Sequence, residues 1–486
     1  QPEEPKSMVT YYSGLQRPDV AAHGMPAVTI AIAKKIGSNG VTVAQNILDK
    51  IESLKSPDIG LITSDIHVEV TRNYGETARN KVNALILKLF IATGAVTLLV
   101  WFFLGWRPAF VVTLVIPVVL LMTVFAAWLG GFTIDRVSLF ALIFSIGILV
   151  DDAIVVIENI YRRWLAKGVT DTATAIDAVR EVGNPTILAT FTVVAALMPM
   201  AFVSGLMGPY MSPIPMLGSV AMILSLFAAF VFVPWLAMRI KPGMAALEKA
   251  EHDEERDNAR VKKILDKSLV PLIEDKRKGN IFLVSLIVVF FLFCAFFLLK
   301  WVPVKMLPFD NKPEFSVVIN MPSGTAVPTT ANLTSRITER IRKDVPHVTA
   351  LQTYVGTAKP FDFNGMVRHY YLRDKPWQAE IQVQLKDKDL RDESSHELAV
   401  QARAIVDEIV AEYNRQNPVN GKGVRTTVVE MPPGPPVLQT MVADVYGPTA
   451  EIRRQVAEDI TLKFEEAEYV GDVDNYIEAP HYITEF

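Results

Sequence analysis

Two adjacent aspartates, Asp151 and Asp152, lie in a mostly apolar run at residues 137–159. An acidic side chain at the centre of a membrane span costs about 2.5–3.5 kcal/mol to insert, so a fold keeps two of them only where partners or water meet them. A low dielectric constant and the repulsion between the two charges both favour proton uptake, and the two titrations are coupled. The pair could therefore load and release protons near neutral pH, which is the chemistry of an ion-coupled membrane transporter.

Other interpretations of these acidic residues stay open at the level of sequence. The pair could be a buried polar contact that only locks helices together, whereas a metal site is disfavoured because no His or Cys accompanies it. A basic partner would complete a proton switch, but no apolar run of the chain has Lys or Arg well inside it. Glu158 follows Asp151 by seven residues and lies on the same helix face. It could be the point where protons enter, although an ordinary interfacial carboxylate is the favoured interpretation.

The elements that must position these residues are long apolar runs. The chain has 486 residues, 50% of them hydrophobic, and a mean hydropathy of +0.27. Runs of the length that crosses a bilayer, about 20 residues, occur at 84–104, 109–129, 137–159, 185–203, 217–240 and 281–301. Six closely spaced runs predict a helical membrane bundle rather than core helices of a soluble protein. The first residue, Gln1, and the patterned last segment lead us to expect a fragment of a longer chain.

Lys and Arg are concentrated in the loops after the first, third and fifth runs. The positive-inside rule places these loops in the cytoplasm, so residues 1–81 and 303–486 are expected outside. The highly charged stretch 243–279 has apolar residues at helical spacing. It is either an amphipathic helix on the inner membrane surface or a solvated helical linker.

The outer segment after residue 302 predicts a small α+β domain. Strands are expected at 314–321, 349–355, 378–385 and 425–430, and helices at 329–343 and 394–414. This order, β-α-β-β-α-β, is the split βαβ pattern of ferredoxin-like folds. After a proline-rich break a second unit is expected to begin with strand 439–446, helix 449–468 and strand 472–477, and half a unit is expected at 27–34 (strand), 41–53 (helix) and 67–71 (strand).

Several kinds of site are not indicated by the sequence. The chain has no G-x-x-x-x-G-K-[ST] loop and no G-x-S-x-G motif, and its seven histidines lack ligand spacing. A net charge of −4 does not indicate nucleic-acid binding. The single cysteine, Cys294, allows no intrachain disulfide. Methionines in the apolar segments suit packing better than a soft-metal path. We therefore predict no enzyme, no cofactor other than a proton gradient, and no metal centre.

Residues 147–159 (GILVDDAIVVIEN) closely resemble the fourth transmembrane helix of the RND (resistance–nodulation–division) efflux pumps, in the hydrophobe/amphiphile (multidrug) branch. Residues 103–107, 116–120, 306–310, 314–317 and 321–325 extend the resemblance along the chain. The heavy-metal branch typically has one Asp followed by Ala where this chain has both acids, so the resemblance favours amphiphilic compounds over metals.

The resemblance implies a domain organisation and a proton relay. It implies the end of a first-half periplasmic porter subdomain at 1–81, transmembrane helices two to six at 82–240, a cytoplasmic amphipathic linker at 241–280, transmembrane helix seven at 281–301, a porter subdomain at 302–431 and the start of the next at 432–486. Asp151 and Asp152 match the Asp pair of the family's relay. The Lys of that relay belongs to a helix outside this chain.

The resemblance also implies partners and a substrate loop. It implies a proton antiporter in the bacterial inner membrane, a homotrimer that works with a periplasmic adaptor (membrane fusion) protein and an outer-membrane channel and exports amphiphilic small molecules. Drug pockets in the family are lined by aromatic residues and bordered by a flexible loop. Phe361 and Phe363 are the nearest candidates here, although an ordinary surface loop is the favoured interpretation. The alternatives are a heavy-metal or lipid exporter of the same superfamily and a protein-translocation or sensing relative.

Overall fold

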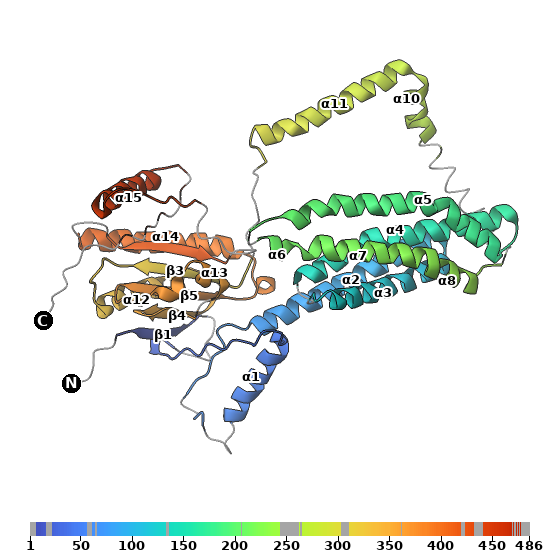
Figure 1. The fold of residues 1–486 in the computed structure, drawn as a ribbon. Helices are drawn as coiled ribbons and strands as arrows, with labels where there is room; N and C mark the ends of the chain where they lie inside the picture. The colour runs from blue at the N-terminus through green and yellow to red at the C-terminus, as the bar shows by residue number, and fades with distance from the viewer. Residues whose placement is uncertain are drawn as a thin grey trace. The chain divides into compact units, whose positions relative to one another are not determined.

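The chain forms two compact units in its computed structural model (Figure 1). One unit holds Ile36–His67 and Arg72–Lys305, and the other holds Gln1–Lys35, Val68–Thr71 and Met306–Phe486. The residues that the structure describes are 6–15, 22–55, 61–63, 66–132, 136–205, 207–243, 262, 265–302, 311–360, 362–418, 423–431, 441–468, 470, 473, 475 and 477.

Within the described residues, six helical segments are long and apolar enough to cross a membrane, by length and composition. They are α2 (Tyr74–Leu104), α3 (Trp106–Leu129), α4 (Arg136–Lys167), α5 (Thr172–Leu197) with the 3-10 turn Met198–Phe202, the segment Met207–Arg239 and α11 (Lys276–Leu298). The fifth segment is divided into α6 (Met207–Met211), α7 (Pro213–Phe227), a π turn (Ala228–Phe232) and α8 (Val233–Arg239). Each segment overlaps one predicted run, so the prediction of six membrane-capable helices is confirmed.

Helix α4 packs against α2, α3, α5 and α7. Val156, Ile157, Ile160 and Trp164 recur along α4 at the spacing of one helix face and are fully buried. The indole of Trp164 also donates a hydrogen bond from Nε1 to the backbone oxygen of Asp171, at 3.1 Å. The helix that carries the two aspartates is therefore fixed by neighbours along most of its length.

The π turn between α7 and α8 has a local cause in Pro234. Proline has no N–H to donate to the carbonyl four residues earlier, and its ring collides with that carbonyl in a regular α-helix. The wider turn, in which the Val233 N–H donates to the Ala228 oxygen, relieves this collision. The irregular turn therefore lies just beyond the end of α7.

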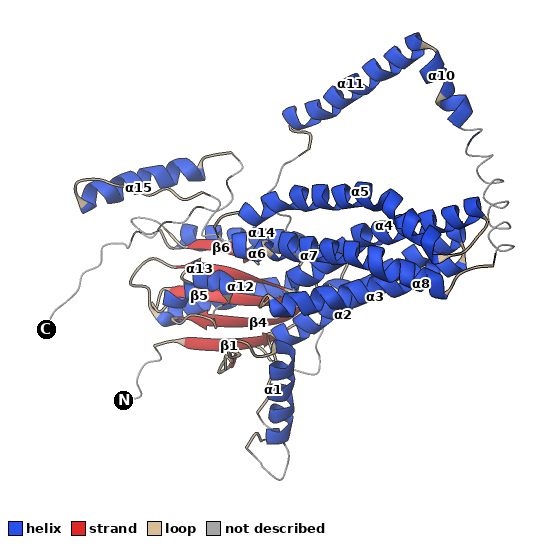
Figure 2. Ribbon diagram, turned by 45° about the vertical axis from the view of Figure 1, so that its right-hand side comes forward, coloured by secondary structure: helices blue, strands red, loops and turns tan. Residues whose placement is uncertain are grey.

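The other unit is built on an antiparallel sheet, whose strands are red in Figure 2. It has six strands in the order β2-β1-β4-β5-β3-β6. The strands are β1 (Met8–Ser13), β2 (Met25–Pro26), β3 (Glu314–Asn320), β4 (Val348–Val355), β5 (Gln378–Leu385) and β6 (Arg425–Glu430). Helices α12 (Val327–Asp344) and α14 (Ser395–Gln416) pack against one face and against each other. From β3 to β6 the order is strand, helix, strand, strand, helix, strand, with element ends within a few residues of those predicted.

An apolar core fills the space between this face and the two helices. Leu333, Ile337 and Ile341 lie on one side of α12 and are fully buried against Val317 and Ile381 of the sheet. This spacing of three and four residues on the helix meets the two-residue alternation of the strands. The two periodicities, both visible in the sequence, explain why the elements of this unit were predictable.

Two predicted strands before α2 do not form. Residues 27–34 and 67–71 are not in strands, although α1 (Gly40–Lys55) forms between them as predicted. A strand needs a neighbour for its N–H and C=O groups, and the sheet ends at the two-residue strand β2. Val28 and Ile30 show the consequence, since the alternating apolar side chains that suggested a strand are exposed.

The predictions for the remaining segments have mixed outcomes. Helix α15 (Ala450–Glu465) forms at the predicted helix 449–468, but residues 441–446 of the predicted strand 439–446 are not a strand. Half of the predicted strand 472–477 and most of the stretch 243–279 lie outside the described residues. Within that stretch the structure shows the short helix α10 (Val270–Glu274).

Candidate functional site: the acidic pair of helix α4

The two aspartates of α4 have different surroundings. Asp152 is half-buried, and its Oδ2 accepts a hydrogen bond from the Ser225 hydroxyl of α7 at 3.2 Å. Asp151 is exposed on the surface of the bundle. Adjacent residues point about 100° apart on a helix, so only one of the pair faces α7. The arrangement gives one carboxylate a fixed hydroxyl donor and leaves the other open to a further partner.

Ser225 is a site residue that the sequence interpretation missed. It is 1% exposed and belongs to α7, the helix with the most extensive contact to α4. The contact is close because small residues, among them Ala221 on α7 and Ala153 on α4, are fully buried at it. Small residues in the fifth apolar segment therefore indicate a close helix contact from the sequence alone. They do not identify Ser225 as the residue that reaches Asp152.

The end of α4 after the aspartates is tied to α5 through Asn159. The Asn159 Nδ2 donates to the backbone oxygen of Ala178 at 2.8 Å and to Glu181 Oε2 at 3.1 Å. Arg163 Nε donates to the same carboxylate oxygen at 2.7 Å. Glu158, the candidate for proton access, is exposed and takes no part in this network. Asn159, its neighbour in the sequence motif, thus joins the helices.

The loop between β4 and β5 contains the aromatic candidates. Phe361 lies outside the described residues, and Phe363 is the first residue of the short helix α13 (Phe363–Val367). Near the start of the loop, the Lys359 Nζ lies 2.8 Å from Glu380 Oε1. Near its end, Arg373 donates from Nη2 to the backbone oxygens of Ile319 (2.8 Å) and Ala379 (3.1 Å) and from Nη1 to Asn320 Oδ1 (2.8 Å). Both ends of the loop are therefore fastened to the sheet.

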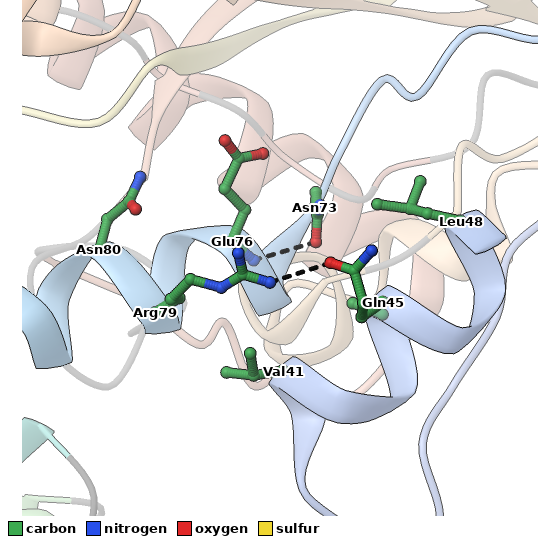
Figure 3. A pocket seen from close by; sticks show the side chains of 8 residues that line it. Val41, Gln45, Leu48, Asn73, Glu76, Arg79 and Asn80 are labelled. Carbon is green, nitrogen blue, oxygen red and sulfur yellow. Dashed lines mark hydrogen bonds between the residues drawn. The ribbon is translucent and has the colours of Figure 1, made fainter.

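A separate hollow lies between α1 and the start of α2, with a volume of about 250 Å³. Figure 3 shows Gln45 of α1 and Arg79 of α2 pointing toward each other, and the Arg79 Nη2 donates to Gln45 Oε1 at 3.0 Å. Asn73 caps α2 by accepting the backbone N–H of Glu76 at 3.1 Å. These contacts hold α1 against α2, and none of the sequence-predicted site residues lines the hollow.

Metal chemistry has no support in the described part of the chain. There, no group of three or more His, Cys, Asp or Glu side chains is placed to hold a metal ion.

Comparisons with known proteins identify the kind of chain that carries this site. The model of the AcrB/AcrD/AcrF family matches residues 8–476. A segment of 223 residues is 32% identical to the multidrug resistance protein MdtC of Pantoea ananatis (strain AJ13355), covering 46% of this chain and 21% of that protein. The MdtC protein of Pectobacterium atrosepticum is 31% identical over 220 residues, 45% of this chain and 21% of the relative. The aligned segment thus spans about a fifth of the length of these relatives.

Proposed function

Because this chain belongs to the AcrB/AcrD/AcrF family of RND multidrug efflux transporters, we propose that it acts in a proton antiporter that exports drugs or other amphiphilic compounds across the cell envelope. The observation that carries the proposal is the acidic pair of α4, with Asp152 held by Ser225 and Asp151 open to a partner. Insertion of two carboxylates in a span is costly, and proton coupling gives them a use.

The geometry suggests how protonation changes the helix contact. An ionised Asp152 only accepts hydrogen bonds, so it accepts one from the Ser225 hydroxyl. A protonated Asp152 can donate instead, and the direction of that bond then reverses. The exposed Asp151 is where a basic residue of another helix would bind the ionised pair and release it on protonation. Glu158, two turns along the same face, is a point from which protons could reach Asp151.

The rest of the chain fits parts of such a transporter. The six apolar helices support a multi-pass protein of the inner membrane. The strands β3 to β6 lie in the order β4-β5-β3-β6, with two helices on one face, which supports a ferredoxin-like (split βαβ) periplasmic porter subdomain. We propose that the loop with Phe361 and Phe363 borders the substrate path. The complete transporter would act as a homotrimer with a periplasmic adaptor protein and an outer-membrane channel.

Substitution of the two acids tests this function. Asp151→Asn and Asp152→Asn, each expressed in an efflux-deficient host, should abolish resistance to amphiphilic drugs while the protein stays in the membrane at normal levels. Asp177→Asn is the matched control, because its side chain is 53% exposed on α5, and it should keep full resistance. Full resistance in both α4 variants would rule out the relay. Glu158→Gln separates a proton path, which lowers resistance, from a surface carboxylate, which does not.

A further inference from the structure

A buried carboxylate lies on the sheet face that α12 and α14 do not cover. Glu380 of β5 is 1% exposed, and its Cα partners are Tyr354 across the β4–β5 ladder and Val318 across the β3–β5 ladder. Side chains two residues apart on a strand share a face, which places Gln352, Gln382 and Ser316 beside it. This second face of the sheet is therefore a polar layer, although it is buried.

The charge of Glu380 is balanced by an ammonium group from the covering loop. The Lys359 Nζ lies 2.8 Å from Glu380 Oε1 and donates to Ser316 Oγ at 2.7 Å, and its side chain is 5% exposed. Burial of two charges is favourable only where they are paired and further hydrogen-bonded. The carboxylate belongs to a strand and the ammonium to the loop, so this ion pair holds the start of the loop on the sheet.

The polar layer has hydrogen-bonding capacity that this pairing does not use. The Gln352 side chain is 3% exposed, and neither its Nε2 nor its Oε1 has a hydrogen-bond partner among the described residues. Neither carboxylate oxygen of Glu380 has a hydrogen-bond partner within the described part of the chain, although Oε1 lies at ion-pair distance from Lys359. Buried polar atoms without partners are costly. A second arrangement, in which another group uses them, would recover that cost.

An aromatic residue lies beside the same carboxylate. Tyr354 lies directly opposite Glu380 in the sheet, and Tyr370 comes from the loop. The Tyr370 ring already faces a cation, because the Arg373 guanidinium carbon lies 6.0 Å from its centroid. Tyr354 is therefore the ring beside Glu380 that an alkylammonium ion would meet, and a carboxylate next to an aromatic ring suits such an ion.

We propose that Glu380 binds the cationic head group of amphiphilic substrates, and that the Lys359 ammonium occupies this site until a substrate displaces it. The inference rests on the proposed export function and names one substrate class for it. Arg373 holds the far end of the loop through three hydrogen bonds, so displacement of Lys359 can free one end of the loop while the other stays fixed. The freed carboxylate would then meet the substrate beside Gln352 and Tyr354.

Two probes and three variants test the proposal on the purified full transporter. Ethidium carries a fixed positive charge and Nile red is uncharged, and fluorescence polarisation reports the binding of each. Glu380→Gln should weaken ethidium binding about tenfold, which is ~1.4 kcal/mol, and leave Nile red binding unchanged. Lys359→Gln should strengthen ethidium binding, because it removes the competing ammonium. The double variant keeps a neutral pair of similar shape and should bind ethidium like Glu380→Gln.

Glu380→Gln and Lys359→Gln should change ethidium binding in opposite directions if Glu380 is a binding site. If the ion pair is only structural, each variant should change the binding of ethidium and of Nile red in the same direction. Asp344→Asn, which breaks the half-exposed Arg340–Asp344 pair on α12, is the control and should change neither probe. Equal binding of ethidium by all variants would overturn the inference, as would parallel losses for ethidium and Nile red. If a single variant fails to fold, the double variant decides, because undiminished ethidium binding by it contradicts a role for Glu380. Failure of the unaltered protein to bind either probe would instead contradict the proposed export function.

Discussion

The hydrogen bond from Ser225 to Asp152 joins α7 to α4, and its role can be tested by removing one oxygen atom. Ser225→Ala removes the hydroxyl that donates to Asp152 Oδ2 at 3.2 Å. A hydrogen bond to a charged group contributes about 1.5–3 kcal/mol, and 3.2 Å is beyond the usual range for O–H···O contacts. The lower value, about 1.5 kcal/mol, is therefore appropriate. If this bond holds Asp152 in place at the step that limits transport, the export rate should fall about tenfold.

The rate of export of a fluorescent substrate from preloaded cells measures this effect. Ser219→Ala is the matched control, because Ser219 lies on the same helix, is 9% exposed, and its hydroxyl has no hydrogen-bond partner among the described residues. Its export rate should stay close to that of the unaltered protein. Ser225→Thr keeps the hydroxyl and should restore most of the rate. Equal rates for the two alanine variants would refute the positioning role of Ser225.

Two further predictions concern the stability of the sheet unit, followed in the whole protein by hydrogen–deuterium exchange. Ile337 is fully buried under the sheet, so Ile337→Ala should lower the free energy of unfolding of this unit by about 3 kcal/mol and speed exchange in β3 and β5. Arg336 lies on the exposed side of α12, so the control Arg336→Ala should change this free energy by less than about 0.5 kcal/mol. Glu397 accepts the backbone N–H of Ser394 in the capping box of α14, which holds the pKa of its carboxyl below its usual value of 4.5. Its contribution is complete above that value and is lost as the pH falls through the lower folded-state pKa, so exchange in α14 should rise on acidification, and Glu397→Gln should remove that part of the pH dependence.

The elements were predictable where local pattern decides the structure. Six apolar runs gave six helices, and the alternation in residues 314–430 gave the strands and helices of the sheet unit. Residues 27–34 alternate equally well, yet Val28 and Ile30 are exposed and no strand forms. Alternation shows that a segment can pair, but not whether a neighbouring strand is in place, because that depends on parts of the chain far away in sequence.

The acidic pair was visible in the sequence, but its partner was not. Two carboxylates in an apolar run are conspicuous because burial of charge is costly. Ser225 is 73 residues away from Asp152, and serines are unremarkable in membrane helices, so only the packing of α7 on α4 singles it out. Similarly, the alternating polar residues of β5 suggest a solvated face, whereas the structure buries Glu380 under the loop that carries Lys359. Contacts of this kind depend on tertiary packing and cannot be read from local pattern.

Proton movement during transport tests the central claim about Asp151 and Asp152 most directly. The complete transporter, reconstituted in vesicles with a pH-sensitive dye inside, should move protons in the direction opposite to an amphiphilic substrate when both gradients are present. Asp151→Asn and Asp152→Asn should each abolish this substrate-dependent proton flux while substrate binding is kept. Export without proton movement in the unaltered protein, or undiminished proton flux in both variants, would contradict the account.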